Sequence, residues 1–218
     1  MSDPVKRRGY VSPLRAERAR RSRSRIVAAA IRLFLADGYA RTTIAAVAAA
    51  AGVSADLVFH LFGSKRELLR AAMDASVGGD DQDVPFLERA EPQAMRRETD
   101  QRRQIAMFAA GMAGQLERVR PVDDMLRNAA AVDPQIAALR EDIQLRQRRQ
   151  AMTTVAGWLR DRGPFRDDMP VEQAAAVIWT LTSPEVHRML TVDWAWTSTQ
   201  YRDWLRTTLQ ATLLPGPP

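Results

Sequence analysis

Residues 42–65 read TTIAAVAAAAGVSADLVFHLFGSK, and this stretch decides the fold. An apolar run at residues 44–51 predicts one short helix, and the chain must turn sharply at Gly52, directly after it. A second short helix is predicted over residues 54–61, where apolar side chains recur. Two short helices joined by a tight turn that contains glycine form a helix-turn-helix.

Capping residues support these helix starts. Thr42 or Thr43 is the natural N-cap of the first short helix and Ser54 that of the second, because a hydroxyl oxygen accepts a free backbone N–H. Ser64 and Glu67 have the spacing of a capping box, in which each side chain bonds the backbone N–H of the other residue. The box predicts a further helix that begins next to the helix-turn-helix.

An earlier helix is predicted upstream, where apolar residues have helical spacing and a glycine follows. These residues are Ile26, Ala30, Leu33, Phe34 and Gly38.

Downstream, the sequence predicts more helices and no sheet. Residues 78–83 are polar, and we expect a loop there that extends to about Glu91. A long helix is expected from Asp133 toward Arg162, and a last helix contains Tyr201. Prolines are tolerated at the first helical position, and four of them are interpreted as helix starts. These are Pro121, Pro134, Pro170 and Pro184. No window alternates with a period of two for long enough to indicate a strand, so the predicted fold class is all-α.

Positive charge is concentrated in the N-terminal third. The chain has a net charge of +6 from 32 Lys and Arg against 26 Asp and Glu. Residues 1–70 hold 14 basic and 5 acidic residues, whereas residues 71–218 hold 18 and 21. This asymmetry predicts that the N-terminal end meets a polyanion. A solvated basic tail is the alternative, and the neighbouring helix-turn-helix favours nucleic acid.

Composition argues against several classes of protein. With 218 residues, 46% of them hydrophobic, the chain can bury an ordinary core in one or two domains. No apolar run reaches the roughly 18 to 20 residues of a membrane helix, and the basic residues 1–25 lack the apolar segment of a secretory signal. We therefore expect a cytoplasmic protein. There is no cysteine and there are two histidines, so we expect no disulfide, no metal site and no cofactor.

The region around the helix-turn-helix resembles the DNA-binding domain of the TetR family of transcriptional regulators, over about residues 20–72 and without a gap. The resembling positions are Arg25-Ile26, Leu33-Phe34, Gly38-Tyr39, Thr42-Thr43-Ile44, Val47-Ala48, Ala51-Gly52-Val53-Ser54, Phe62-Gly63-Ser64-Lys65 and Leu68-Leu69. The resemblance implies a basic arm at 1–19, a three-helix DNA-binding domain at 20–72, and a larger helical effector-binding and dimerisation domain at 73–214.

The resemblance also implies which residues contact DNA. Residues 54–60 would form the recognition helix, whose N-terminal residues meet base edges in the major groove. Thr42, Thr43 and Lys65 would lie at helix N-termini, where N–H groups and the helix dipole favour phosphate. The predicted DNA-binding residues are Arg25, Thr42, Thr43, Ser54, Ala55, Asp56, Phe59, His60 and Lys65.

Two positions depart from the family pattern. Phe59 stands where many relatives carry a tyrosine, so we expect an apolar contact, for example with a thymine methyl group. Leu61 stands where His or Tyr is frequent, so we expect His60 to make the polar contact, with a surface histidine as the alternative. Asp56 either accepts from a cytosine amino group or only suits the helix dipole.

The C-terminal domain of such regulators holds a ligand pocket and the dimer interface. Candidate pocket residues are Met107, Phe108, Met112, Met125, Met152, Trp158 and Trp179, with plain core as the alternative. Candidate interface residues are Ala174, Val177, Ile178, Leu181, Trp204 and Leu205, with an intramolecular core stripe as the alternative. A small-molecule ligand is expected to be apolar or aromatic. A homodimer would present two recognition helices to half-sites about 34–36 Å apart on palindromic double-stranded DNA.

The expected function is that of a sequence-specific repressor released from its operator by ligand. The alternatives are a regulator without a small-molecule effector and a non-specific architectural DNA binder. An acid/base pair could be proposed around His187, with Glu185 and Asp193 close in sequence. No nucleophile or phosphate-loop motif accompanies it, so we do not expect an enzyme.

Overall fold

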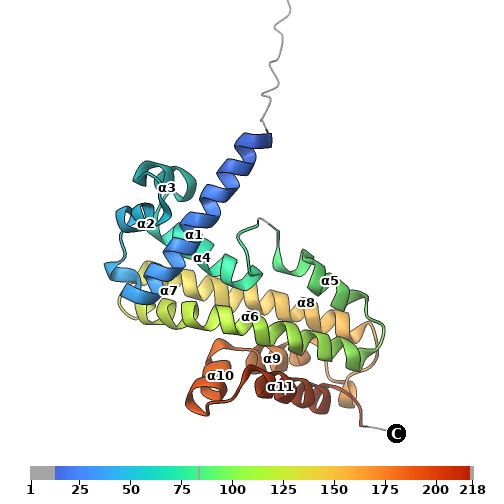
Figure 1. Cartoon of the computed structure of the whole chain (residues 1–218). Coiled ribbons are helices and arrows are strands. Elements are labelled where there is room, and N and C mark those ends of the chain that lie inside the picture. Colours follow the sequence, from blue (N-terminus) through green and yellow to red (C-terminus); the bar gives the residue numbers. More distant parts are fainter. Residues whose placement is uncertain (1–12, 83, 217–218) are drawn as a thin grey trace, which may run out of the picture.

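The computed structural model describes residues 13–82 and 84–216, and these residues are helical with no strand among them (Figure 1). The predicted all-α class is confirmed. The α-helices are α1 (Pro13–Arg41), α2 (Ile44–Ala51), α3 (Ala55–Phe62), α4 (Lys65–Gly78), α5 (Ala90–Arg97), α6 (Gln101–Ala130), α7 (Pro134–Glu141), α8 (Arg149–Arg160), α9 (Val171–Leu181), α10 (Pro184–Arg188) and α11 (Ser198–Leu213). Two π-helical stretches, Asp142–Arg148 and Met189–Asp193, and two 3₁₀ turns, Phe86–Glu88 and Arg166–Asp168, complete them.

The predicted domain boundaries fall inside helices. α1 begins at Pro13, so residues 13–19 of the predicted arm run directly into the first helix of the helix-turn-helix, while residues 1–12 lie outside the described part of the chain. α4 continues past residue 72 to Gly78. The N-terminal and C-terminal parts therefore share a helix.

Most of the predicted helix starts are confirmed by capping hydrogen bonds. The hydroxyl groups of Ser64 and Ser183 each accept the backbone N–H three residues on. The box at Ser64 is only half formed, because the Glu67 carboxylate bonds Arg66 and the Ser64 N–H donates to the Phe62 carbonyl oxygen. A complete capping box occurs instead at Thr197, which begins α11.

Two of the predicted proline helix starts are wrong. Pro121 does not begin a helix but lies inside the 30-residue α6. Pro170 is the N-cap residue of α9 rather than its first helical residue. The loop expected up to about Glu91 ends close to that position, since α5 begins at Ala90 behind Arg89, which makes no side-chain cap. The long helix expected after Asp133 is present as α7, the π-helical stretch and α8 in succession, ending at Arg160.

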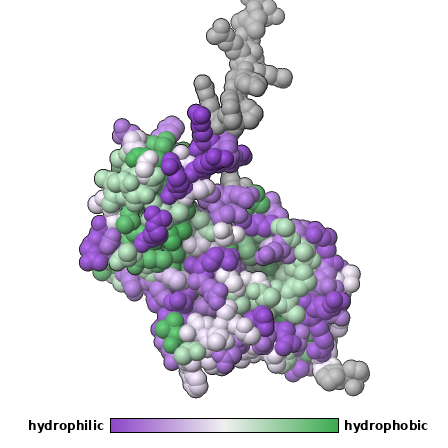
Figure 2. Space-filling view, viewed as in Figure 1, coloured by the Kyte–Doolittle hydropathy of each residue, from purple (hydrophilic) through white to green (hydrophobic). Residues whose placement is uncertain are grey.

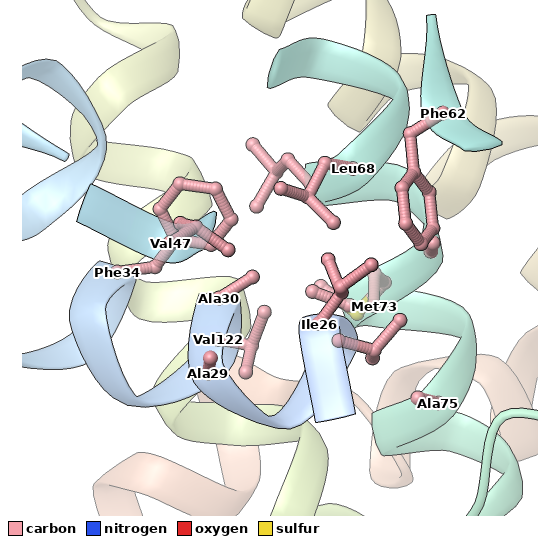
Figure 3. Packing of buried hydrophobic residues seen from close by; sticks show 14 of the residues in the cluster. Ile26, Ala29, Ala30, Phe34, Val47, Phe62, Leu68, Met73, Ala75 and Val122 are labelled. Carbon is pink, nitrogen blue, oxygen red and sulfur yellow. The ribbon is translucent and has the colours of Figure 1, made fainter. Parts of the chain in front are cut away.

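Two hydrophobic cores share α6. The first core joins α1–α4 to α7 and to the C-terminal half of α6, and Figure 3 shows Val122 of α6 among side chains such as Ile26 and Phe34 of α1. The second core joins the N-terminal half of α6 to α8, α9 and α11, around the fully buried Tyr201 and Leu159. The DNA-binding candidate region is therefore packed directly on a helix of the C-terminal domain.

No single helix among the described residues is long and apolar enough to cross a membrane. α2 and α3 pass the length and composition test only as a pair, and they are bent by 108° relative to each other.

Candidate DNA-binding surface and effector cavity

Two capping hydrogen bonds and one glycine turn stabilise the helix-turn-helix. The Thr43 hydroxyl caps α2 by accepting the Ala46 N–H at 3.1 Å, and the Ser54 hydroxyl caps α3 by accepting the Leu57 N–H at 3.2 Å. Between them, Gly52 adopts a left-handed backbone with φ of 65°, which a residue with a side chain adopts only at a cost. These bonds and this turn set the angle at which α3 leaves α2.

α3 buries one face and exposes the other. Val58 is fully buried and Phe62 nearly so, which anchors the helix in the first core. Asp56, Phe59 and His60 are exposed, as predicted, and Phe59 leaves 52% of its surface in solvent.

Two of the predicted orientations on α3 need qualification. Ala55 is half-buried and packs against the first core, although the sequence placed it on the DNA side. Leu61 packs against that core as predicted, whereas Leu57 is only half-buried. The solvent-exposed face of α3 is therefore narrower than the sequence predicted, and the exposed aromatic ring of Phe59 lies at its centre.

The Thr42 side chain, a predicted DNA-binding residue, is turned inward in this structure and offers no hydroxyl to a phosphate. Thr42 is 2% exposed, and its hydroxyl donates to the Gly38 carbonyl oxygen at 2.9 Å, with the Leu33 carbonyl oxygen at 3.2 Å. Gly38 interrupts the helical backbone of α1 shortly before Thr42. The Thr42 hydroxyl bonds hold the end of α1 next to the start of α2. Thr43 is exposed and keeps its place as a candidate phosphate contact.

Lys65 has a structural role that the sequence did not reveal. Its Nζ donates to the carbonyl oxygens of Tyr39 and Thr42 at 2.9 and 3.0 Å, and that of Ala40 lies at 3.4 Å. The ammonium also lies 4.2 Å from the centre of the Tyr39 ring. Burial lowers the pKa of Lys65 below its usual value. An ammonium has three donors, so this side chain is engaged in closing the α1 C-terminus, and only backbone N–H groups of the first α4 turn remain for phosphate.

α1 carries an exposed basic surface toward its N-terminus, and this part of the molecule is strongly hydrophilic (Figure 2). Arg25 is exposed, as a DNA contact requires. Arg20 and Arg21 both bond Glu17, but all three side chains are solvent-exposed, and ion pairs of this kind are weak. Arg20, Arg21 and Arg25 therefore remain available to a polyanion.

The segment after α4 is bonded to α1. The Ser24 hydroxyl donates to Asp81 Oδ1 at 2.6 Å, and Arg23 lies 4.0 Å from the same carboxylate. The Arg23 guanidinium also lies 4.8 Å from the centre of the Phe62 ring at the end of α3. One acidic residue thus links the loop that follows α4 to the helix that carries the basic surface.

Two adjoining cavities, of about 630 and 990 Å³, lie where the two cores meet. Both are bordered by Gln82 and by residues within 84–89, called here the Gln82–Arg89 wall with Asp83 left out, and by Met112 of α6 and Met152 of α8. The smaller one reaches α4 through Met73 and Val77. Gly78 permits this arrangement, because a Cβ there would lie 2.5 Å from a nitrogen of the Arg89 guanidinium.

Five of the seven predicted pocket residues line these cavities, namely Met107, Phe108, Met112, Met152 and Trp158. The other two do not. Met125 belongs to the first core, and the Trp179 ring stacks on Arg148 and donates through Nε1 to the Gln144 carbonyl oxygen at 3.3 Å. Sequence reasoning missed the Gln82–Arg89 wall, because an irregular segment has no periodicity to reveal which side chains turn inward.

A buried polar network borders the smaller cavity. Asp123, fully buried, accepts from Gln144 Nε2 at 2.9 Å and from Arg140 at 3.3 Å, and Arg140 also bonds Glu185 at 2.6 Å. Burial raises the pKa of Asp123 and lowers the pKa of Arg148 to about 10. The network ties α6 to the helices on either side of it.

The predicted dimer stripe is part of the second core. Ala174, Ile178 and Leu205 are fully buried within one chain, so they cannot meet a partner. The other three, Val177, Leu181 and Trp204, are half-buried and pack against the same core. The exposed apolar side chains at this end of the molecule are instead Met189, Val192 and Trp194, the last with 74% of its surface in solvent.

The residues considered for acid/base chemistry have different partners. His187 is buried with its ring centre 4.7 Å from that of Tyr201. Glu185 bonds Arg140, and Asp193 bonds Arg188 at 3.1 Å. The structure therefore does not assemble these three residues into one site.

Comparison with known proteins places the N-terminal region in a family. Residues 26–72 match the family model described as bacterial regulatory proteins, tetR family. Over 59 residues, 27% of this chain, the sequence is 41% identical to the HTH-type transcriptional regulator TtgR of Pseudomonas putida. The match spans 28% of the length of that relative.

Solved structures extend the similarity to the whole fold. The SmeT–triclosan complex is 20% identical and superimposes with a TM-score of 0.67, over 89% of this chain and 92% of that one. A transcriptional regulator of Saccharomonospora viridis in complex with choline is 19% identical, with a TM-score of 0.64, over 89% and 98% of the two chains. Residues 26–72 thus match the helix-turn-helix domain of the TetR family, and the chain shares its fold with TetR-family regulators of known structure.

Proposed function

We propose that this protein is a sequence-specific DNA-binding transcriptional regulator that acts as a homodimer on a palindromic operator. The observation that carries the proposal is the exposed face of α3, where Asp56, Phe59 and His60 point to solvent on a helix anchored by Val58. An exposed aromatic ring on a rigid helix, next to a basic helix, suits a groove with phosphates on both sides. Residues 20–72 supply this surface in the proposal.

The phosphate contacts in the proposal come from α1 and the helix N-termini. Arg25 supplies charge, and Thr43 and Ser54 are exposed N-cap residues at the N-termini of α2 and α3. Asp56 and His60 are the candidates for polar base contacts, and Phe59 for a thymine methyl group. Lys65 contributes by fixing the end of α1 and through the N-terminus of α4.

The proposed homodimer uses a different surface from the one the sequence indicated. Met189, Val192 and Trp194 are exposed and directly follow α10, which lies at the end of the molecule away from α3 in Figure 1. A second copy on this end would leave both α3 helices free for DNA, and large apolar side chains are enriched at such interfaces. Trp194→Asp is then expected to sediment as a monomer and to lose cooperative binding to two half-sites. A dimeric Trp194→Asp protein would remove this surface from the interface.

We further propose that the protein is a repressor and that a small, largely apolar ligand in the cavities releases it from DNA. α4 supports this coupling, since Met73 and Val77 border the cavity while the same helix packs on α1. The Ser24–Asp81 hydrogen bond gives a second link from the cavity wall to α1. The triclosan and choline complexes of two proteins with the same fold support a ligand of small-molecule size.

Selection of bound duplexes from a random library, at low and near-physiological salt, tests the DNA-binding proposal. We expect a palindromic motif that survives physiological salt, because specific sites are typically bound about 10³–10⁷ times more tightly than random DNA. Binding without a motif, lost as salt rises, would favour the architectural alternative. Duplex release by 1-decanol, an uncharged apolar probe, tests the ligand step. Decanol that binds the protein and leaves the duplex bound would favour a regulator without a small-molecule effector.

A further inference from the structure

The wall that the two cavities share carries an amide N–H without a hydrogen-bond partner. Gln115 of α6 is 8% exposed and lines both cavities. Its Oε1 has almost no accessible surface, so the accessible end of the amide is Nε2. Among the described residues, no acceptor bonds this nitrogen. An amide nitrogen is a donor only, so the partner that Gln115 lacks is an acceptor on a ligand.

The guanidinium groups on the lining already have protein partners. Arg89 bonds Asp80 at 2.8 Å and also donates to backbone carbonyl oxygens. Arg148 donates to the Trp179 carbonyl oxygen and to the Thr182 hydroxyl. An anionic ligand would have to break these bonds to pair with either arginine, so the lining does not favour a negative charge.

The carboxylates on the lining do not favour a positive charge either. Asp74 and Glu88 border the smaller cavity, but both are exposed, so water already stabilises their charge and a pair with a cation would be weak. Gln150 borders the same cavity and is also exposed, so water can accept its amide N–H when no ligand is bound. Gln115 differs from these three in being buried, and its N–H is the polar group that a ligand can satisfy best.

We propose that the cavities bind an uncharged apolar molecule that carries a hydrogen-bond acceptor, such as a ketone, an ester or a lactone. Its carbonyl oxygen would accept the Gln115 amide N–H. Its carbon skeleton would contact Met112 and Met152, which are buried and border both cavities. Methionine side chains adapt to irregular apolar shapes, which suits a ligand of this kind.

This inference rests on the proposed effector function and names the chemistry of the ligand. Four probes with the same ten-carbon skeleton separate an acceptor from a charge: 2-decanone has an acceptor only, 1-decanol an acceptor and a donor, decylammonium donors only, and decanoate acceptors with a negative charge. Isothermal titration calorimetry measures their binding to the full chain, below their micelle or solubility limits. We expect 2-decanone and 1-decanol to bind about three- to tenfold more tightly than decylammonium, because one hydrogen bond to a buried donor contributes at this level. Decanoate should bind more weakly than 2-decanone, because its charge must lose water without gaining an unengaged guanidinium.

Matched variants assign the preference to one side chain. Gln115→Leu should weaken 2-decanone about three- to tenfold and leave decylammonium unchanged. Gln150→Leu removes an exposed amide from the same lining and should weaken 2-decanone by less than about twofold, because its N–H bonds water in the free protein. The infrared carbonyl stretch of bound 2-decanone, labelled with ¹³C at the carbonyl carbon, reports the hydrogen bond directly. It should lie at a lower frequency in the parent than in Gln115→Leu.

Each remaining outcome overturns the inference in a distinct way. Decylammonium or decanoate binding as tightly as 2-decanone would refute the acceptor preference and leave the effector cavity standing. Equal losses for Gln115→Leu and Gln150→Leu, or the same carbonyl frequency in Gln115→Leu and the parent, would refute the bond to Gln115. Failure of all four probes to bind would refute both the acceptor site and the ligand-binding half of the proposed function, while the duplex selection would still report on DNA binding.

Discussion

The N-terminal and C-terminal halves of this molecule differ in whether their buried polar side chains have hydrogen-bond partners. In the first core the buried hydroxyl groups of Thr42 and Ser76 both donate to backbone carbonyl oxygens. The buried polar side-chain atoms without a partner, within the described residues, all lie from residue 104 onward, and include the Gln104 and Gln115 amide oxygens and His187 Nε2. Such groups reduce stability but can be satisfied by a ligand or by rearrangement.

The difference fits the proposed function, in which the N-terminal half presents a helix to DNA and the C-terminal half takes up a ligand. A recognition helix must be held in one orientation to read base edges, and the close packing around Val58 and Phe62 provides this. A cavity that is bordered by methionine side chains and by hydrogen-bond acceptors without partners has a less precisely fixed shape. α6 contributes side chains to both hydrophobic cores, which is the physical link between the two halves.

The largest expected difference between the two halves is in the free energy of unfolding that is lost when a side chain is truncated. Phe34→Ala removes a ring that is 1% exposed in the first core and should lower the free energy of unfolding by about 3–5 kcal/mol. Met112→Ala removes a side chain that already borders the cavities, so the loss should be near the low end for such changes, about 2 kcal/mol. Urea unfolding of the two variants beside the parent measures both values. Equal losses would mean that the two halves are equally well packed.

The next effect is a pH dependence that arises in the C-terminal half. Burial, and next to it the charge of Arg120, lowers the pKa of His187 from 6.5 to about 4. The unfolded chain therefore binds a proton between about pH 6.5 and 4 that the folded chain does not, and the folded state loses stability as the pH falls through this window, by about 3 kcal/mol at most. Unfolding measured at about pH 7 and about pH 4.5 should show a smaller loss in His187→Gln than in the parent. Identical losses would exclude His187 as the cause.

A pair of smaller substitutions should differ in sign. Thr42→Val keeps the shape of the side chain but removes its bonds to Leu33 and Gly38, and should destabilise the chain by about 1 kcal/mol. Gln115→Leu replaces an unsatisfied buried amide with an apolar group of similar size and should stabilise it by up to about 1 kcal/mol. Thermal unfolding gives both signs. A destabilised Gln115→Leu would indicate that the Gln115 amide is satisfied in the free protein.

The smallest expected effect is on DNA affinity. Arg25→Ala should weaken binding to all duplexes alike and reduce the slope of log K against log salt by about 0.9, the value for one phosphate contact. Arg160→Ala, an exposed arginine at the end of α8, is the matched control and should leave the slope unchanged. Parallel salt titrations of the two variants decide the point. Equal slopes for Arg25→Ala and the parent would remove Arg25 from the phosphate contacts.

The sequence predicted the N-terminal half well because its signals are local. The caps at Thr43 and Ser54 and the turn at Gly52 act within three or four residues, so their spacing is visible in the chain. Exposure of Phe59 and His60 followed from the helical repeat. The contacts of Thr42 and Lys65 could not be predicted in this way. Both side chains bond carbonyl oxygens at the end of α1, whose position depends on the three-dimensional fold.

The C-terminal half was predicted less well because its arrangement depends on contacts between distant residues. A stripe of apolar residues on α9 has the same pattern whether it faces α8 or a partner chain, and in the structure Ala174 and Ile178 face inward. Pro121 reads as a helix start, yet α6 accommodates it within 30 helical residues. The cavity wall at Gln82–Arg89 has no repeating pattern at all, and its inward side chains are defined by α4, α6 and α8 together.

The central claim is that the outward face of α3 reads base sequence. It is tested most directly by duplex selection at near-physiological salt with the parent chain and with a Phe59→Ala/His60→Ala double variant, side by side. Both side chains are exposed, so the variant should fold as the parent does. We predict a palindromic motif for the parent, and for the variant a motif altered symmetrically in both half-sites or lost. The same motif from both proteins would contradict the account and assign base reading to another part of the chain.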